Sequence, residues 1–240
     1  MNDVFFVRSA VSLPAAGRRF SIAHCQLPAA PELTILKGSF QKMVVEFLYS
    51  IDETVFLILN RGVANPVFDF IMPIITEEHN QMIPIVVAWL GLVIFGGKKG
   101  RITALLVVVL ITLSNFLSSE VIKPLVGRVR PCFVVDGVRL LIEQSRSPSF
   151  PSSHAANNAA WAALFSVKYS RLKWVFIFIA GMIAYSRIYI GVHYPSDMIA
   201  GAVLGVGCAF FVLFLERCFH RIRTRRKRRG GEQEVEAIKG

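Results

Sequence analysis

Charged residues are scarce in this sequence: Asp, Glu, Lys and Arg make up only 18% of its 240 residues, while 54% are hydrophobic. The mean hydropathy is +0.53. A soluble domain needs more polar surface than this, so the composition indicates that the protein resides in a lipid bilayer. We therefore expect an all-α fold, a polytopic bundle of membrane helices.

The sequence also lacks the residue spacings that mark metal and redox sites. Its four cysteines, Cys25, Cys132, Cys208 and Cys218, form no metal-binding or redox motif, so we expect no disulfide. No cluster of carboxylates marks a metal site either. The expectation is a protein that uses neither a metal ion nor another cofactor.

The N-terminal region has no clear pattern, and no apolar core leads to a small-residue cleavage site, so no signal peptide is expected. We predict a flexible extension over residues 1–42, a membrane domain over 43–220 and a basic tail over 221–240. Acidic residues interrupt the first apolar stretches of the domain. Helices lying in the membrane interface are expected there, and a sixth span over 43–60 is the alternative.

Five apolar segments approach or exceed the length needed to cross a membrane, which is roughly 20 residues. They cover residues 80–97, 101–123, 155–167, 174–190 and 198–215. The third segment is short by itself and spans only with its polar flanks. The sequence thus predicts five transmembrane helices.

Basic residues predict the orientation of these segments. They cluster between the first and second segments, between the third and fourth, and after the fifth: Lys98, Lys99 and Arg101; Lys168, Arg171 and Lys173; and the run "ERCFHRIRTRRKRRGG" from residue 216. If each segment crosses once, all three clusters fall on one side, which the positive-inside rule assigns to the cytoplasm. Residues 124–154 and 191–197 then lie together on the non-cytoplasmic side, and the C-terminus is cytoplasmic.

The net charge of +11 could suggest a nucleic-acid partner. Because the basic residues border membrane segments, we expect no nucleic acid and instead expect the tail to meet anionic lipid head groups. Nothing in the sequence indicates an oligomeric state.

Three short polar stretches fall at the non-cytoplasmic ends of the segments: "KPLVGRVRP" (123–131), "PSSH" (151–154) and "SRIYIGVHYPSD" (186–197). Lys123, Arg130 and Arg187 carry positive charge, and the forked donors of arginine match phosphate oxygens. A single cation at a membrane boundary more often reaches for the head groups. Three stretches that converge on one face favour a phosphate site.

The second stretch has the pattern of a helix start. Pro151 suits the opening of a helix, and Ser152 and Ser153 suit its N-cap and first turn. A helix N-terminus offers N–H groups and partial positive charge to an anion. We expect the serines and backbone amides to hold an anion, with His154 beside it.

The third stretch contains a second histidine in a different setting. Pro195 disfavours helix at Tyr194 and can start a new helix, so His193 should lie in the preceding turn. Asp197 then falls in the first helical turn and can reach back to His193. A carboxylate on one ring nitrogen fixes the tautomer and leaves the other nitrogen free to attack. Tyr194 itself fits the aromatic belt of the membrane interface.

These residues resemble the three motifs of the type 2 phosphatidic acid phosphatase (PAP2) superfamily of membrane lipid phosphatases, which are K-x6-RP, PSGH and SR-x5-H-x3-D. The matching residues are Lys123, Arg130 and Pro131; Pro151, Ser152 and His154; and Ser186, Arg187, His193 and Asp197. The resemblance covers about residues 44–218. Ser153 replaces the glycine of the second motif, which would be strained only where the backbone needs positive φ.

The resemblance implies a role for each matched residue. His193 would be the nucleophile and form a phosphohistidine, Asp197 would orient it, and His154 would protonate the leaving oxygen. Further residues would hold the phosphoryl oxygens: Lys123, Arg130, Ser152, Ser153 and Arg187. Because these cations supply the positive charge, the implied mechanism needs no metal.

The leading hypothesis is therefore a lipid phosphatase in a bacterial inner membrane, with its site on the non-cytoplasmic face. The short outer loop most resembles undecaprenyl-diphosphate phosphatases; phosphatidate, phosphatidylglycerophosphate and a lipid A phosphate are alternative substrates. A lipid phosphotransferase would use the same residues. A transporter or proton relay should also place ionisable residues at mid-span, and a vanadium-dependent haloperoxidase should lack the apolar segments.

Overall fold

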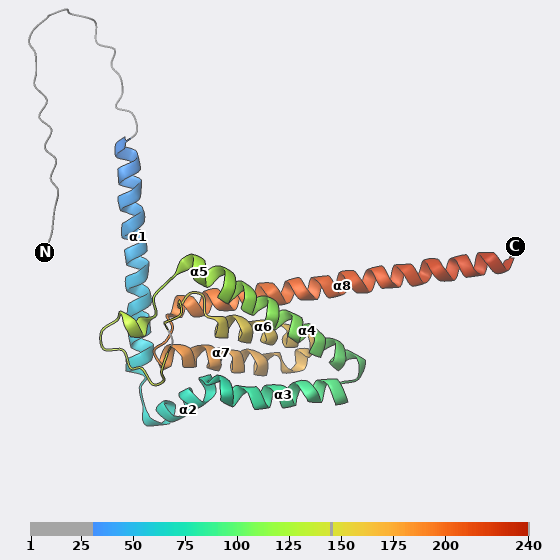
Figure 1. The fold of residues 1–240 in the computed structure, drawn as a ribbon, viewed down its shortest axis with the longest axis horizontal. Helices are drawn as coiled ribbons and strands as arrows, with labels where there is room; N and C mark the ends of the chain where they lie inside the picture. Colours follow the sequence, from blue (N-terminus) through green and yellow to red (C-terminus); the bar gives the residue numbers. More distant parts are fainter. Residues whose placement is uncertain (1–30, 145, 240) are drawn as a thin grey trace, which may run out of the picture. The chain divides into compact units, whose positions relative to one another are not determined.

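The computed structural model describes the backbone of residues 31–144 and 146–239, with side chains for residues 42–77, 79–144 and 146–225. The described chain is helical and contains no strand, which confirms the all-α expectation (Figure 1). The α-helices are α1 (Pro31–Leu57), α2 (Pro66–Thr76), α3 (Glu78–Phe95), α4 (Gly97–Asn115), α5 (Lys123–Val126), α6 (Ser153–Lys168), α7 (Lys173–Tyr189) and α8 (Pro195–Lys239). Two π-helices, Ile58–Gly62 and Phe116–Ile122, and two 3₁₀-helices, Pro131–Phe133 and Ser170–Leu172, lie between them.

Two compact units are distinguished, residues 1–44 and 45–240, and the candidate site lies in the second. Residues 1–30 of the expected flexible extension lie outside the described residues. Residues 31–42 are helical and continue into the rest of α1. At the other end, α8 runs without a break through the basic tail to Lys239.

Three helical segments are long and apolar enough to cross a membrane: Gly97–Phe133, Ser170–Tyr189 and Pro195–Arg225. They contain three of the five expected spans. The apolar part of α3, His79–Phe95, and helix α6 are shorter, so their crossing stays a prediction. Where a sixth span was the alternative, the helical segment Lys42–Gly62 is followed by α2 after a bend of 115°.

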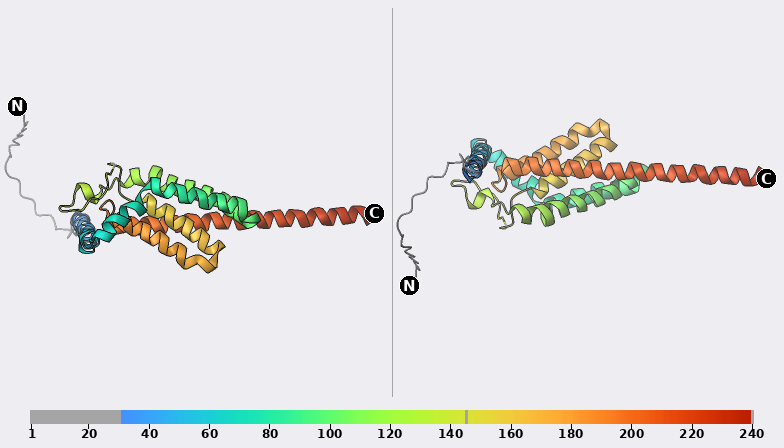
Figure 2. Two further views of the ribbon diagram at one scale, coloured as in Figure 1. Left: turned by 90° about the horizontal axis from the view of Figure 1, so that it is seen from below. Right: turned by 90° about the horizontal axis from the view of Figure 1, so that it is seen from above.

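Helix α6 is the central element of the bundle. It packs against α4, α7 and α8, while α3 packs on α4 and α2 on α7. The views in Figures 1 and 2 agree that α6 runs beside the first half of α8 and that α7 runs beside α6. An apolar core forms between α4, α6 and α8, around Leu110, Leu164 and Val212.

Helices α6 and α8 approach each other closely, and this contact depends on small residues. Gly201 and Gly205 lie four positions apart on the face of α8 that meets α6. A Cβ at Gly205 would overlap the carbonyl group of Ala156, and one at Gly201 would overlap the carbonyl oxygen of Ser152. Helices in membranes commonly use this spacing to bring their backbones together. Here it sets the N-termini of α6 and α8 side by side.

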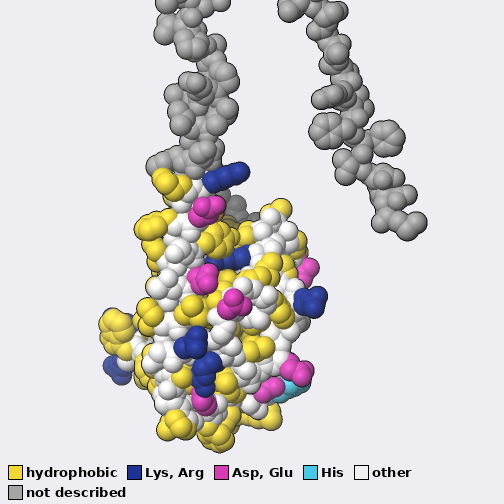
Figure 3. Space-filling model, turned by 90° about the vertical axis from the view of Figure 1, so that its left-hand side faces the viewer, with side chains coloured by type: hydrophobic (Ala, Val, Ile, Leu, Met, Phe, Trp, Pro, Cys, Tyr) yellow, Lys and Arg dark blue, Asp and Glu magenta, His cyan; other side chains and the backbone are white. Residues whose placement is uncertain are grey.

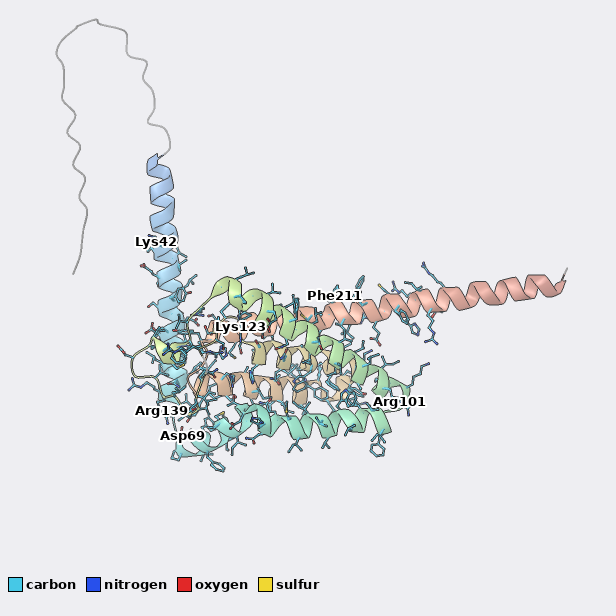
Figure 4. All side chains as sticks on the ribbon, in the orientation of Figure 1. Lys42, Asp69, Arg101, Lys123, Arg139 and Phe211 are labelled. Atoms are coloured by element: carbon cyan, nitrogen blue, oxygen red, sulfur yellow. The ribbon has the colours of Figure 1, made fainter. Side chains whose placement is uncertain are left out.

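The basic clusters of the sequence meet at the opposite end of the bundle. Lys99 Nζ lies 4.6 Å from the ring centroid of Tyr169, and Lys168 Nζ donates to Glu216 Oε1 at 2.6 Å. Figure 4 shows Arg101 and Lys123 toward opposite ends of the long segment that contains α4. One end of the bundle therefore carries the basic clusters and the other the three motif stretches.

The contact between α6 and α8 predicts the effect of a single methyl group. We expect Gly205→Ala to destabilise the protein by about 1–3 kcal/mol or more, since the overlapping atoms belong to the backbone of α6 and cannot rotate away. Gly207→Ala is the matched control, because its Cβ would meet no atom within 4 Å. Alanine favours helix over glycine at both positions. Thermal unfolding in detergent measures the difference, and equal midpoints for the two variants would contradict the predicted close contact.

Candidate active site

The turn between α7 and α8 is the structural centre of the site. It covers residues 190–194, all of which are buried. Gly191 has φ +89°, and a Cβ there would lie 2.7 Å from the carbonyl oxygen of Arg139, so the turn requires glycine. It reverses the chain between two apolar helices and places His193, which is only 1% exposed, inside the protein.

His193 and Asp197 are brought together across the start of α8. His193 Nδ1 lies 3.4 Å from Asp197 Oδ2, and the same oxygen accepts the backbone N–H of Tyr194 at 3.0 Å. Asp197 is fully buried in the first turn of α8. The carboxylate is thus held toward one nitrogen of the imidazole.

Arg130 approaches the other nitrogen of the His193 ring. Its Nη1 lies 3.0 Å from Nε2, and the guanidinium is anchored by Ser147, whose carbonyl oxygen accepts from Arg130 Nε at 2.8 Å. A guanidinium can only donate, so Nε2 must be the acceptor and the ring proton belongs on Nδ1. This tautomer directs the N–H toward Asp197 and leaves the lone pair on Nε2.

The remaining motif cations face both histidines. The positive charges of Arg187, Lys123 and Arg130 act on His154 as well as on His193. Arg187 is buried in the last turn of α7, and its Nη1 donates to the hydroxyl of Thr76 at 3.1 Å. The structure therefore gathers cations from the first and third motif stretches around the two imidazoles.

Both histidines are held neutral by their surroundings. Burial lowers the pKa of His193 well below its usual range, and the nearby cations lower it further. Burial also lowers the pKa of His154, to about 3, with the same cations acting in the same direction. Two neutral imidazoles among three cations form an environment that favours an anion.

The serines of the second motif start α6. Ser152 is the N-cap, and its Oγ accepts the N–H of Ala155 at 3.3 Å, which confirms the expected capping. Its own backbone N–H donates to the carbonyl oxygen of Asp197 at 3.1 Å, so only its hydroxyl proton remains for a ligand. Ser153 is the first helical residue, and its Oγ lies 2.9 Å from the Oγ of Ser119.

The end of the bundle that carries these groups has a mixed surface. Figure 3 shows basic and acidic side chains gathered on this face among hydrophobic ones. Across the described residues, no group of three His, Cys, Asp or Glu side chains is placed to hold a metal ion. The charged groups of the site are mainly basic, as phosphate binding requires.

Arg128, Asp52 and Ser196, which lie outside the predicted set of site residues, form a hydrogen-bonded network next to Asp197. Arg128 Nη1 donates to Asp197 Oδ1 at 2.8 Å, and Arg128 Nη2 donates to Asp52 Oδ2 at 2.7 Å. Asp52 also accepts the backbone N–H of Ser196 at 2.9 Å. Arg128 lies within the first polar stretch, and Asp52 interrupts an apolar run, so each residue is noticeable in the sequence. The residue spacing alone does not indicate that they meet at Asp197.

The expectation that Tyr194 belongs to an interfacial aromatic belt is wrong. Tyr194 is only 5% exposed, and its ring lies 3.9 Å from the Arg128 guanidinium and 5.6 Å from the ring of Phe56. Its amphipathic character serves an internal cation–π contact instead. Thr76, whose hydroxyl accepts a hydrogen bond from Arg187, likewise belongs to no motif in the sequence.

Comparison with known proteins identifies the family. The model of the PAP2 superfamily matches residues 103–219. The chain is 31% identical over 177 residues to a lipid A 4'-phosphatase of Bacteroides thetaiotaomicron, covering 68% of this chain and 75% of the relative. It is also 31% identical over 144 residues to an undecaprenyl-diphosphatase of Sulfolobus acidocaldarius, covering 52% of this chain and 70% of the relative.

A solved structure shares the arrangement of the helices. The PAP2-type phosphatidylglycerolphosphate phosphatase of Bacillus subtilis superimposes with a TM-score of 0.58 at 26% identity, covering 71% of this chain and 86% of that protein. The relatives are named as phosphatases of lipid phosphate groups, in agreement with the enzyme class predicted from the motifs. With its three motifs gathered at one end of a helical bundle, the chain belongs to the PAP2 superfamily.

Proposed function

We propose that this protein is an integral membrane lipid phosphatase that hydrolyses a phosphate monoester or diphosphate head group through a phosphohistidine at His193. The observation that carries the proposal is the placement of the His193 ring between Asp197 and Arg130. Its Nδ1 lies 3.4 Å from Asp197 Oδ2 and its Nε2 lies 3.0 Å from Nη1 of Arg130, a phosphate-type cation, and this arrangement requires the ring proton on Nδ1. A nucleophile and its phosphate-binding partner are thus in contact.

In the first step the phosphoryl oxygens bind the cations of the site. They compete for Arg130, whose donor otherwise occupies the Nε2 lone pair of His193. The freed lone pair attacks phosphorus, the bond from phosphorus to the leaving oxygen breaks, and Asp197 stabilises the positive charge that develops on the ring. Lys123 and Arg187 neutralise the charge of the phosphoryl oxygens in the transition state.

His154 provides the proton for the leaving oxygen. The surrounding cations lower its pKa, and a bound phosphoryl group brings compensating negative charge that raises it. The protonated imidazole can then act as a general acid. In the second step neutral His154 takes a proton from water, the hydroxide attacks phosphorus, and the bond to Nε2 of His193 breaks to release phosphate.

The substrate class follows from the chemistry of the site and from the relatives. The named relatives act on lipid A, undecaprenyl diphosphate and phosphatidylglycerophosphate, which share a phosphate at the head of a long apolar chain. The motif stretches end apolar helices, where such a head group rests. We assign the protein to the same substrate class, with undecaprenyl diphosphate still a leading candidate.

The same arrangement supports an orientation in a bacterial inner membrane. The basic clusters around Lys99 and Lys168 lie at the end away from the motifs, so the positive-inside rule assigns that end and the C-terminus to the cytoplasm. The site then opens to the non-cytoplasmic face. The tail would meet anionic lipids; its side chains beyond residue 225 lie outside the described residues.

The roles of the two histidines are tested by substitution. His193→Ala should abolish turnover, because no other group attacks phosphorus, and His154→Ala should lower it about 10²- to 10⁴-fold, the usual contribution of a general acid. Phosphate release from a lipid phosphate by purified protein in detergent is the measurement. Both variants should unfold at nearly the wild-type temperature. Hydrolysis by His193→Ala at a rate near wild type would exclude the assigned nucleophile.

The substrate class is tested with a panel of lipid phosphates assayed in EDTA. We expect kcat/KM to be much higher for long-chain prenyl or diacyl phosphates than for a soluble phosphomonoester, because the bilayer-anchored tail concentrates and orients the head group. Undecaprenyl diphosphate, a lipid A phosphate and phosphatidylglycerophosphate are compared in the same micelles. Equal efficiency on the soluble ester would argue against a lipid substrate, and transfer of phosphate to an added alcohol would identify a phosphotransferase.

The serine in the second motif should be compatible with catalysis. Ser153 begins α6 in helical conformation, so the position needs no glycine, and its hydroxyl meets Ser119. We expect Ser153→Gly to keep activity within about threefold of wild type, since the backbone N–H is retained and glycine in a first turn costs at most about 1 kcal/mol. A loss comparable to that of His154→Ala, measured in the same assay, would mean that the hydroxyl itself acts on the substrate.

A further inference from the structure

The Arg128 guanidinium lies between two buried carboxylates that are far apart in the sequence. It donates to Asp52 Oδ2 at 2.7 Å and to Asp197 Oδ1 at 2.8 Å. The Arg128, Asp52 and Asp197 side chains are 8%, 10% and 0% exposed, respectively. A cation that joins two charges at this depth must match both geometries, because solvent cannot compensate for a poor fit.

Further contacts fix the plane of the guanidinium. Tyr194 and Tyr49 lie with their ring centroids 3.9 Å and 4.8 Å from its central carbon. Arg128 Nη1 also donates to the hydroxyl of Ser196 at 2.7 Å, and that hydroxyl donates in turn to Asp52. The network thereby ties α1, which lies outside the residues matched by the family model, to the first turn of α8.

The two oxygens of Asp197 have separate partners. Oδ1 accepts from Arg128, while Oδ2 faces His193 Nδ1 and the Tyr194 amide. Rotation of the carboxylate would break both sets of contacts at once. The orientation of Oδ2 toward the imidazole therefore depends on what holds Oδ1.

We propose that Arg128, anchored by Asp52, is a positioning residue that fixes Asp197 so that its Oδ2 orients His193 for attack. The inference rests on the proposed phosphoryl transfer at His193. The side chain of Arg128 donates to Asp52, Ser196 and Asp197, away from the motif cations. Its loss should therefore slow the chemical step more than it weakens binding.

Lysine at this position tests the geometry while keeping the charge. The lysine ammonium has a single nitrogen, so it cannot reproduce the planar guanidinium, which donates to two carboxylates from separate nitrogens. The matched control is Arg139→Lys. Arg139 Nη2 also donates to an aspartate, Asp69 Oδ2, at 2.7 Å, and Figure 4 labels both residues of this pair. The pair is about one-third exposed, and its ion pair involves neither Asp197 nor His193.

The experiment measures kcat and KM of the full chain in detergent for Arg128→Lys, Asp52→Asn and Arg139→Lys. Arg128→Lys should lower kcat about 10- to 100-fold, the usual cost of a lost orienting partner, with KM within about twofold. Asp52→Asn should lower kcat less, because an asparagine oxygen can still accept from Arg128 and Ser196. Arg139→Lys should leave both constants unchanged.

A pH profile separates positioning from a general structural effect. The charged or titratable groups that face His193 are Arg130, Arg187, Lys123, His154 and Asp197, and Arg128 and Asp52 lie behind Asp197. The lysine keeps the positive charge but loses the direct hydrogen bond to Asp197 Oδ1, so it neutralises the carboxylate less fully, and more of the carboxylate charge then raises the pKa of the His193 imidazole. Since neutral His193 is the nucleophile, the acid limb of kcat/KM should move to higher pH in Arg128→Lys.

The outcomes distinguish this inference from the proposed function. If wild type hydrolyses no lipid phosphate, or if His193→Ala hydrolyses it as well as wild type, the proposed function fails. If wild type is active and Arg128→Lys keeps its kcat and pH profile, the positioning role is wrong. An Arg128→Lys protein that unfolds at the wild-type temperature but loses kcat supports it. If that variant is unstable, Asp52→Asn decides: unchanged kcat and an unmoved acid limb there would overturn the role.

Discussion

The buried carboxylate of Asp197 is the group on which the arrangement of the site depends. It accepts from Arg128, from the Tyr194 amide and from His193, and its own backbone carbonyl accepts the Ser152 amide. An uncompensated charge at this depth would cost several kcal/mol. Satisfying the carboxylate draws the first polar stretch and the turn before α8 to one place, and the backbone carbonyl of Asp197 holds the start of α6 beside them.

The packing of α6 on α8 makes this meeting of chain segments possible. Gly201 and Gly205 let the two backbones approach until the N-terminus of α6 lies beside Asp197. Both helices then direct the positive ends of their dipoles to the same region. The packing of the bundle and the proposed anion site therefore depend on the same small residues, which join the two helices and also align their N-termini.

The interactions that the sequence predicted join residues close together in the chain, and those that it missed join residues far apart. Ser152 as N-cap and the approach of Asp197 to His193 follow from helix starts, which are local and carry recognisable residues. Arg128 and Asp52 meet across 76 positions, and no spacing rule connects them. Tyr194 was assigned to the interface because an amphipathic ring suits either water at a membrane surface or a buried guanidinium. Only the fold decides between these.

The charge balance of the site explains how two histidines of similar chemistry can take opposite roles. Arg128 is paired with Asp197, and the positive charges of Arg130, Arg187 and Lys123 act on both rings. His193 is then neutral, as the proposed nucleophile must be. His154 has a pKa of about 3 and can gain a proton readily only when negative charge arrives beside it. In the proposed mechanism that charge is the substrate's own phosphate, so binding would itself create the acid that the leaving group requires.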